Sequence, residues 1–190
     1  MIGYAICGSF CTLSDSLAAL EELTKEHDVL PIISENVRRF DTRFGKSAEI
    51  VARCEKLCGR ESVGDIVAAE PLGPARPLDA MVIAPCTGNT LAKLANGVTD
   101  TAVTMAAKAH MRTSRPLLIA LASNDAMSAN LANLARMMMR KGVYFVPMVQ
   151  DDPQGKPYSL VADMRLIPEA IEKARIGVQM RPLFLEKRYI

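Results

Sequence analysis

Short apolar runs alternate with amphipathic stretches along this chain. The apolar runs cover residues 2–7, 29–34, 79–85, 116–123 and 144–148. Between them, apolar residues recur at three- and four-residue spacing, as in Leu13, Leu17 and Leu20, which is the period of a helix with one buried face. The pattern therefore predicts five strands that alternate with helices.

The helices are expected in the stretches that separate these strands. They are residues 13–25, 43–59, a helix that starts within 85–97, and then 99–112, 131–138 and 160–177. Thr12 and Asp15 match a helix start signal in which side chains bond the first free amides. Gly59 is expected to end its helix, because glycine tolerates the left-handed backbone of a C-terminal cap.

Strands that alternate with helices favour an open parallel sheet with helices on both faces. Parallel strands require crossover connections, and both faces of such a sheet are buried, which agrees with runs that do not alternate with polar residues. At 190 residues, with no break in composition, the chain is expected to form a single domain over 1–190. The predicted fold class is a three-layer α/β sandwich.

Composition narrows the class of protein. Hydrophobic residues make up 49% and charged residues 23%, as in ordinary globular proteins. The net charge of +2 is spread without long blocks, so neither nucleic acid nor a membrane surface is an expected partner. The apolar N-terminus lacks a basic start, and no apolar run is long enough to span a bilayer, so a cytoplasmic location is expected. The five cysteines are expected to be reduced thiols, and no metal site is predicted.

Polar residues gather directly after the predicted strands. The four loops are Gly8-Ser9-Phe10-Cys11-Thr12, Ser34-Glu35-Asn36, Pro85 to Thr90, and Ala122 to Asp125. Loops at the carboxyl ends of parallel strands converge, and helix N-termini attract phosphate. These loops therefore predict a site for a phosphorylated cofactor, although each could serve only to cap a helix or form a turn. The loop after the first strand matches neither the dinucleotide nor the nucleoside triphosphate motif.

The segment PCTGNTLAKLANGVTDTAVTMAA, which begins at Pro85, resembles the signature of the flavin mononucleotide (FMN) binding flavoproteins. That family includes peptidyl-cysteine decarboxylases, phosphopantothenoylcysteine decarboxylase and the flavin prenyltransferase. The resemblance implies a flavodoxin-like fold and FMN as cofactor. It implies that the cofactor-binding residues are Gly8, Ser9, Phe10, Ser34, Pro85, Thr87, Asn89, Thr90, Ser123 and Asn124.

Three of these loop residues and one neighbour are open to a second interpretation. Asn89 can bond a ring system or a carboxylate through its amide, or it can instead cap its own helix turn. The residues that flank Ser123 and Asn124 differ from those at the matching place in the decarboxylases. Whether these two residues contact a ligand therefore stays open. Cys86 has no histidine nearby to activate it, so packing is favoured over chemistry.

Nearly the whole chain is similar to one subunit of a two-subunit member of this family that oxidises a dihydropyridine dicarboxylate in sporulating bacteria. The segments SNDAMSANLANLARMM and YFVPMVQDDPQGKPYSLVADM carry this narrower likeness. It implies an oxidoreductase subunit that acts on a small dicarboxylate in the mother cell, with an NADP-dependent partner subunit. No catalytic residue is assigned. Possible carboxylate partners are Arg38, Arg39, Arg43, Arg76 and Lys93.

Other functions stay open at this point. The decarboxylases have a catalytic histidine before the third strand, where this chain reads EPLGPARPLD, so peptidyl-cysteine decarboxylation is disfavoured. A non-catalytic assembly subunit with a vestigial flavin site and a prenyltransferase-like enzyme are the two alternatives.

The likeness also implies assembly. Family members form trimers or larger homo-oligomers, and Met137-Met138-Met139 suggests an adaptable apolar contact. The Pro- and Gly-containing stretch QDDPQGKPYSLVADM, residues 150–164, is expected to protrude and to meet the partner subunit.

Overall fold

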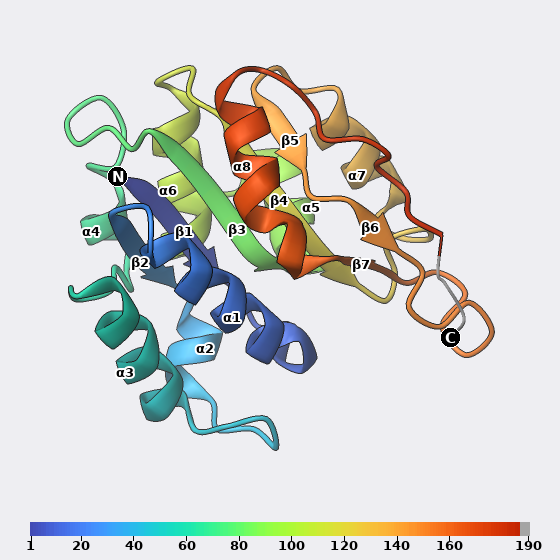
Figure 1. The fold of residues 1–190 in the computed structure, drawn as a ribbon, viewed down its shortest axis with the longest axis horizontal. Coiled ribbons are helices and arrows are strands. Elements are labelled where there is room, and N and C mark those ends of the chain that lie inside the picture. The colour runs from blue at the N-terminus through green and yellow to red at the C-terminus, as the bar shows by residue number, and fades with distance from the viewer. Residues whose placement is uncertain (187–190) are drawn as a thin grey trace.

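Seven strands form one sheet in the computed structural model, which describes residues 1–186 (Figure 1). The parallel strands are β1 (Ile2–Ile6), β2 (Val29–Ile33), β3 (Ala80–Cys86), β4 (Leu117–Ser123) and β5 (Val143–Phe145). They lie in the order β2-β1-β3-β4-β5, because β5 pairs with the first half of β4. This is the flavodoxin-like order, and it confirms the predicted fold class.

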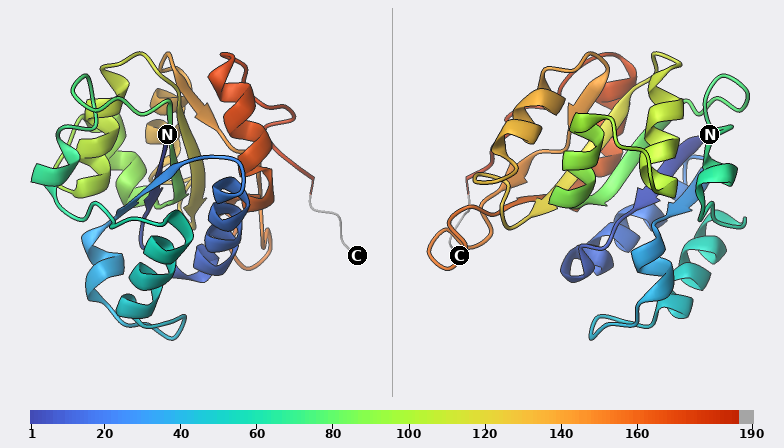
Figure 2. Two further views of the ribbon diagram at one scale, coloured as in Figure 1. Left: turned by 60° about the vertical axis from the view of Figure 1, so that its left-hand side comes forward. Right: turned by 180° about the vertical axis from the view of Figure 1, so that it is seen from behind.

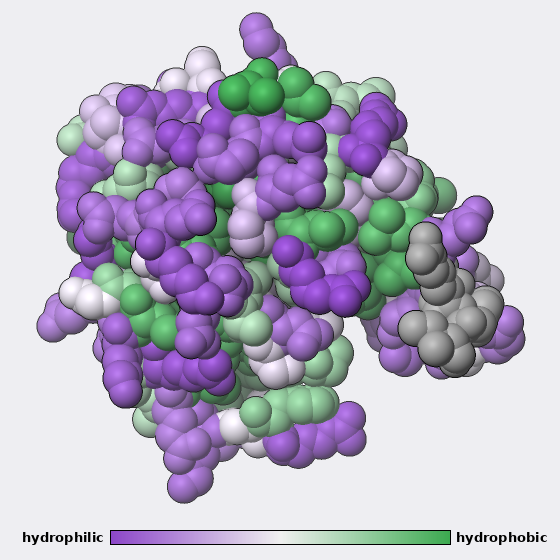
Figure 3. Space-filling view, in the orientation of Figure 1, coloured by the Kyte–Doolittle hydropathy of each residue, from purple (hydrophilic) through white to green (hydrophobic). Residues whose placement is uncertain are grey.

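Helices cover both faces of the sheet. One face carries α1 (Leu13–Thr24), α3 (Ser47–Cys58) and α8 (Ile167–Arg175). The other face carries α4 (Ile66–Ala69), α5 (Gly88–Asn96), α6 (Ala102–Met111) and α7 (Leu131–Met138). Figure 1 and the right-hand view of Figure 2 show the two helical layers from opposite sides. The outer surface over α1 and α8 is mainly hydrophilic (Figure 3).

Successive side chains of the central strand β3 point to opposite faces of the sheet, so β3 contributes to the core on both sides. In β3, Met81 and Ile83 pack with α5 and α6, whereas Val82 and Ala84 pack with α1 and α8. All four are completely buried. A strand with both faces covered has no polar face, which is why its sequence reads as a continuous apolar run.

The end of the chain differs from the prediction. The expected strand at 144–148 is interrupted at Pro147 and continues as β6 (Met148–Val149), and the expected helix over 160–177 begins with β7 (Leu160–Ala162). Both β6 and β7 are antiparallel additions, β7 pairing with the carboxyl end of β4. The 3₁₀ turn Met164–Leu166 then leads into α8, where Pro168 occupies the first turn rather than the middle of a helix.

Two predicted helix ends can be compared with the structure. Gly59 ends α3 with a φ of 63°, as expected for a C-terminal glycine. The expected cap at the start of α1 is wrong. Thr12 donates its hydroxyl to the Ser9 carbonyl oxygen at 3.0 Å instead of accepting from the helix, because the 3₁₀ turn Phe10–Thr12 precedes α1. The short helix α2 (Glu35–Arg39) follows β2 directly.

Within residues 1–186, no helix combines the length and the apolar character needed to cross a membrane.

A buried histidine on α6 is expected to make the stability depend on pH. His110 is fully buried, its Nε2 lies 2.9 Å from the Pro116 carbonyl oxygen, and burial lowers its pKa from the ordinary 6.5. Below that pH the unfolded chain binds a proton more readily than the folded chain. The free energy of unfolding should therefore fall as the pH drops below 6.5, by up to about 1.4 kcal/mol per pH unit.

Denaturant unfolding of His110→Gln between pH 5 and 7 tests this expectation, with His27→Gln as the matched control at the other histidine. The His110 variant should lose this component of the pH dependence, and the control should keep it. Equal pH slopes in the wild type and the His110 variant would contradict it.

Candidate functional site

Two cavities lie at the carboxyl ends of the parallel strands. The first has a volume of about 670 Å³ and the second of about 390 Å³. Both are lined by Gly8 from the loop after β1 and by Thr87 and Asn89 from the start of α5. The chain leaves β1 for β2 on one side and returns to β3 on the other, so these loops diverge and leave a crevice between them. The hollow of the first cavity opens at the lower right of Figure 3, between the start of α1 and loop 150–159.

Most of the predicted cofactor-binding residues line the first cavity. Gly8, Ser9 and Phe10 line it from the first loop, and Ser123 and Asn124 line it from the end of β4. Thr87 and Asn89 complete the predicted set here. Residues that are remote in sequence thus reach one space because their strands end at the same edge of the sheet.

Ser34 and Thr90 line the second cavity instead. The Ser34 hydroxyl oxygen is buried and has no hydrogen-bond partner within the described residues, although Ser34 stands at the N-terminus of α2. Burying a hydroxyl without a partner is costly, so this oxygen indicates a ligand that would supply one. Thr90 donates to the Cys7 sulfur at 3.3 Å.

Pro85 lines neither cavity. It lies inside β3, is buried, and its carbonyl oxygen accepts a hydrogen bond of 3.2 Å from the Cys7 amide. Cys86 beside it belongs to the core, and burial raises the pKa of its thiol well above the ordinary value. The packing role expected for Cys86 agrees with this placement.

The N-terminal cap of α5 belongs to Thr87. Its hydroxyl oxygen accepts from the Thr90 amide at 3.1 Å. Asn89 is exposed, and its side chain forms no hydrogen bond within residues 1–186. The alternative in which Asn89 only caps its own helix turn is therefore wrong, and its amide is available to both cavities.

The charged residues of the first cavity come from three loops. Arg43 lies on the turn before α3, Asp125 follows β4, and Asp151 and Lys156 belong to loop 150–159. Lys156 donates to Asp151 at 3.0 Å, and Ser159 donates to the same carboxylate at 2.7 Å. Burial opposes the charge on Asp151, but these two donors outweigh burial and lower its pKa.

Of the five possible carboxylate partners, the structure brings Arg43 to the first cavity and Lys93 to the second. Lys93 is already paired with Asp100 at 2.8 Å. The other three line neither cavity: Arg38 donates to Ser62, Arg39 stacks on Phe40, and Arg76 lies on the loop before β3. Reasoning from the sequence missed Lys156, because nothing in the linear pattern brings loop 150–159 back to the strand ends.

Asp125 belongs to the fourth loop that the sequence predicts at the site, but it was not among the predicted cofactor-binding residues. Its Oδ1 accepts from the Ser123 hydroxyl, and its Oδ2 accepts from the Asn130 amide at 2.9 Å. Gly88 makes room for this cluster. A Cβ at Gly88 would lie 2.4 Å from the Ser123 oxygen and 2.7 Å from Asp125 Oδ1. The signal that could have identified Asp125 is a third polar residue after a buried strand.

A sequence model of the Flavoprotein family matches residues 2–165. The chain belongs to the Flavoprotein family. It is 48% identical over 186 residues to the B subunit of dipicolinate synthase from Bacillus subtilis (strain 168), covering 97% of this chain and 93% of that protein. A crystal structure of the B subunit of dipicolinate synthase from Bacillus halodurans has a TM-score of 0.90 and 42% identity, covering 98% of this chain and 96% of that one.

A more distant solved structure shares the fold. A dodecameric FMN-dependent UbiX-like decarboxylase from Escherichia coli O157:H7 has a TM-score of 0.66 at 19% identity, and the alignment covers 99% of each chain. These relatives confirm the flavoprotein resemblance and the flavodoxin-like architecture. The roles of the individual site residues stay predictions.

Proposed function

We propose that this chain is the FMN-binding B subunit of a dipicolinate synthase and takes part in the oxidation of dihydrodipicolinate to dipicolinate during sporulation. The observation that carries the proposal is the pair of cavities at the β1/β3 crevice, lined by hydroxyl and amide groups, in a chain 48% identical to a protein of that name. Under this proposal the protein acts in the cytoplasm of the mother cell.

The residues present fit FMN. Gly8 has no side chain between the two cavities, and the buried Ser34 hydroxyl has no protein partner in the described range. Ser9 and Ser34 would hold the phosphate end, and Asn89 would meet the edge of the ring. When bound, FMN would supply a planar, redox-active ring next to the substrate, and the final electron acceptor in this proposal is the nicotinamide nucleotide of the partner subunit. The residues of this chain bind and orient the ligands.

The dicarboxylate substrate is assigned to the first cavity. Arg43 and Lys156 both line it, from loops on either side of the opening, and each can donate to a carboxylate. Among the described residues, the second cavity is lined by one cation, Lys93, so it offers one such contact instead of two. The proposal thus places both substrate contacts in the larger cavity.

Gly8→Val is expected to weaken FMN binding at least about tenfold, which corresponds to about 1.4 kcal/mol. A Cβ at Gly8 would lie 3.3 Å from the Phe10 ring and 3.6 Å from the Asn36 Cβ. Alanine therefore requires only a small shift of the Phe10 side chain, whereas valine adds two further methyl groups at the crevice. Quenching of flavin fluorescence measures the affinity, with Gly8→Ala as the control. If Gly8→Val binds FMN as tightly as Gly8→Ala, the flavin does not occupy this crevice.

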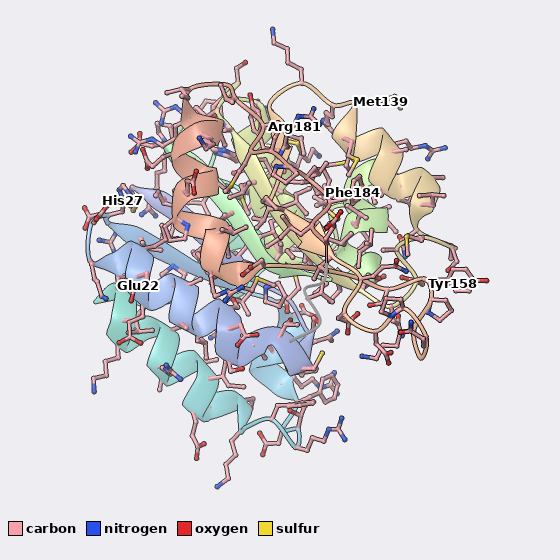
Figure 4. All side chains as sticks on the ribbon, turned by 45° about the vertical axis from the view of Figure 1, so that its right-hand side comes forward. Glu22, His27, Met139, Tyr158, Arg181 and Phe184 are labelled. Carbon is pink, nitrogen blue, oxygen red and sulfur yellow. The ribbon has the colours of Figure 1, made fainter. Side chains whose placement is uncertain are left out.

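Self-assembly into a trimer-based homo-oligomer is a further part of the proposal, and the dodecameric relative supports it. On α7 and just after it, Met137 is buried at 1% exposure, whereas Met139 is 78% exposed (Figure 4). We expect Met139→Glu to lower the mass measured by light scattering and the conservative Met139→Leu to leave it unchanged. A wild-type monomer at micromolar concentration would contradict assembly.

A further inference from the structure

The carboxylate of Asp125 is held in a fixed orientation beside the first cavity. Its two oxygens accept separate hydrogen bonds from the Ser123 hydroxyl and the Asn130 amide. The Asn130 amide is itself oriented, because its oxygen accepts from Asn133 at 3.0 Å. Each carboxylate oxygen can accept two hydrogen bonds, so each keeps one lone pair free.

The hydrogen bonds behind Asn130 continue to the protein surface. Asn96 donates to the Asn133 oxygen at 3.2 Å, and Arg136 donates to the Asn96 oxygen at 2.7 Å. Asn130 is 7% exposed, and a buried amide with both ends bonded cannot turn over without losing these partners. Its NH₂ group is therefore kept facing Asp125.

Asp125 forms no ion pair with any residue in the described range 1–186. This separates it from Asp151, the other carboxylate of the cavity, whose charge is offset by Lys156. Asp125 lies instead beside the first turn of α5, since a Cβ at Gly88 would be 2.7 Å from its Oδ1. The positive end of a helix stabilises an anion there without using its lone pairs in an ion pair.

We propose that Asp125 accepts the proton released when the dihydropyridine ring becomes aromatic. This inference rests on the proposed function. The oxidation breaks two C–H bonds. The hydrogen of the first bond leaves as hydride, with the bonding electron pair, and goes to the nicotinamide nucleotide of the partner subunit. The hydrogen of the second bond leaves as a proton and goes to a free lone pair of the Asp125 carboxylate, while its bonding electrons stay in the ring. The ring therefore loses one hydride and one proton, which together are two electrons and two protons.

The first readout needs neither turnover nor the partner. Calorimetric titration of the FMN-loaded chain with pyridine-2,6-dicarboxylate measures the affinity for the dicarboxylate. Asp125→Asn should bind the dicarboxylate more tightly than the wild type, because the variant removes the repulsion between the dianion and the Asp125 carboxylate. Asp28→Asn, at an exposed carboxylate, should behave as the wild type.

The second readout is turnover with the partner subunit. At saturating substrate, Asp125→Asn should lower kcat about 10²- to 10⁴-fold, the usual contribution of a proton acceptor, with unchanged FMN affinity. The acid limb of the wild-type kcat profile should disappear in this variant. The other charged groups of the cavity are Arg43, Asp151 and Lys156, so the same limb measured in Asp151→Asn shows whether Asp151 contributes to it.

Several outcomes decide the proposal. A kcat within threefold of wild type in Asp125→Asn, or an affinity for the dicarboxylate no higher than that of the wild type, would overturn it while leaving the proposed function intact. A wild-type chain that neither binds the dicarboxylate nor turns over with its partner overturns both. If Asp125→Asn does not fold, Ser123→Ala decides instead, since it removes one donor to the charged carboxylate and should move the acid limb to higher pH. An unmoved limb in Ser123→Ala would contradict the proposal.

Discussion

Gly88→Val is expected to destabilise the protein by about 1–3 kcal/mol and to displace the Asp125 cluster. Any Cβ at this position would lie 2.4 Å from the Ser123 hydroxyl oxygen and 2.7 Å from the Asn130 amide nitrogen. Ser123 and Asn130 both donate hydrogen bonds to Asp125, so neither side chain can move aside without losing its hydrogen bond. Urea unfolding measures the loss of stability, and binding of pyridine-2,6-dicarboxylate measures the damage to the cavity.

Ala92→Val provides the control, because it adds the two γ-methyl groups of valine, without a new Cβ, at a half-buried position one turn further along α5. It should cost only the lower helix propensity of valine, below about 1 kcal/mol. If the free energies of unfolding of Gly88→Val and the control differ by less than about 0.5 kcal/mol, the close packing around Gly88 is not what fixes the cluster.

The second large effect concerns which of the two subunits holds the nicotinamide that accepts the hydride. We expect this chain alone to show no substrate-dependent reduction of NADP, and a mixture with the A subunit of dipicolinate synthase to show it. The loop after β1, Gly8-Ser9-Phe10-Cys11-Thr12, lacks the spacing of a dinucleotide fingerprint, so the hydride would have to reach a nicotinamide held by the other subunit. Absorbance at 340 nm with each chain alone and with both together measures this. Full activity from this chain alone would contradict it.

Loop 150–159 is the proposed contact with the A subunit, but part of it faces the first cavity. Asp151 and Lys156 line that cavity, whereas Tyr158 is 55% exposed on the outer side of the loop (Figure 4). Replacing the whole loop would therefore disturb two functions at once. Tyr158→Ala should weaken association with the A subunit and leave dicarboxylate binding unchanged, and Lys156→Ala should do the reverse. The same effect from both variants would contradict this separation.

The parallel part of the fold could be predicted from the sequence because burial on both faces leaves continuous apolar runs. The runs that correspond to β1 to β4 are bounded by polar loops, and each strand lies within its run except β3, which extends one residue further to Cys86. The antiparallel addition could not be predicted. Strands β6 and β7 have two and three residues, too few for any periodicity, and Leu160 and Ala162 fit a helix as well as a strand.

The site could be predicted only where it follows a strand. Ser9, Asn89 and Asn124 reach one cavity because parallel strands end at the same edge. Arg43 and Lys156 reach it through loops whose paths depend on tertiary packing, so their role is not visible in any local pattern. The orientation of Asp125 depends on Asn130, Asn133 and α5, three contacts that only the folded chain brings together.

The most direct test of the central claim is the visible spectrum of the purified chain during titration with FMN. The proposed pocket predicts a yellow protein, or a colourless one that binds added FMN at one site per chain, with quenched flavin fluorescence and binding that Gly8→Val weakens. A colourless chain that binds no added FMN would contradict the account and favour an assembly subunit with a vestigial site.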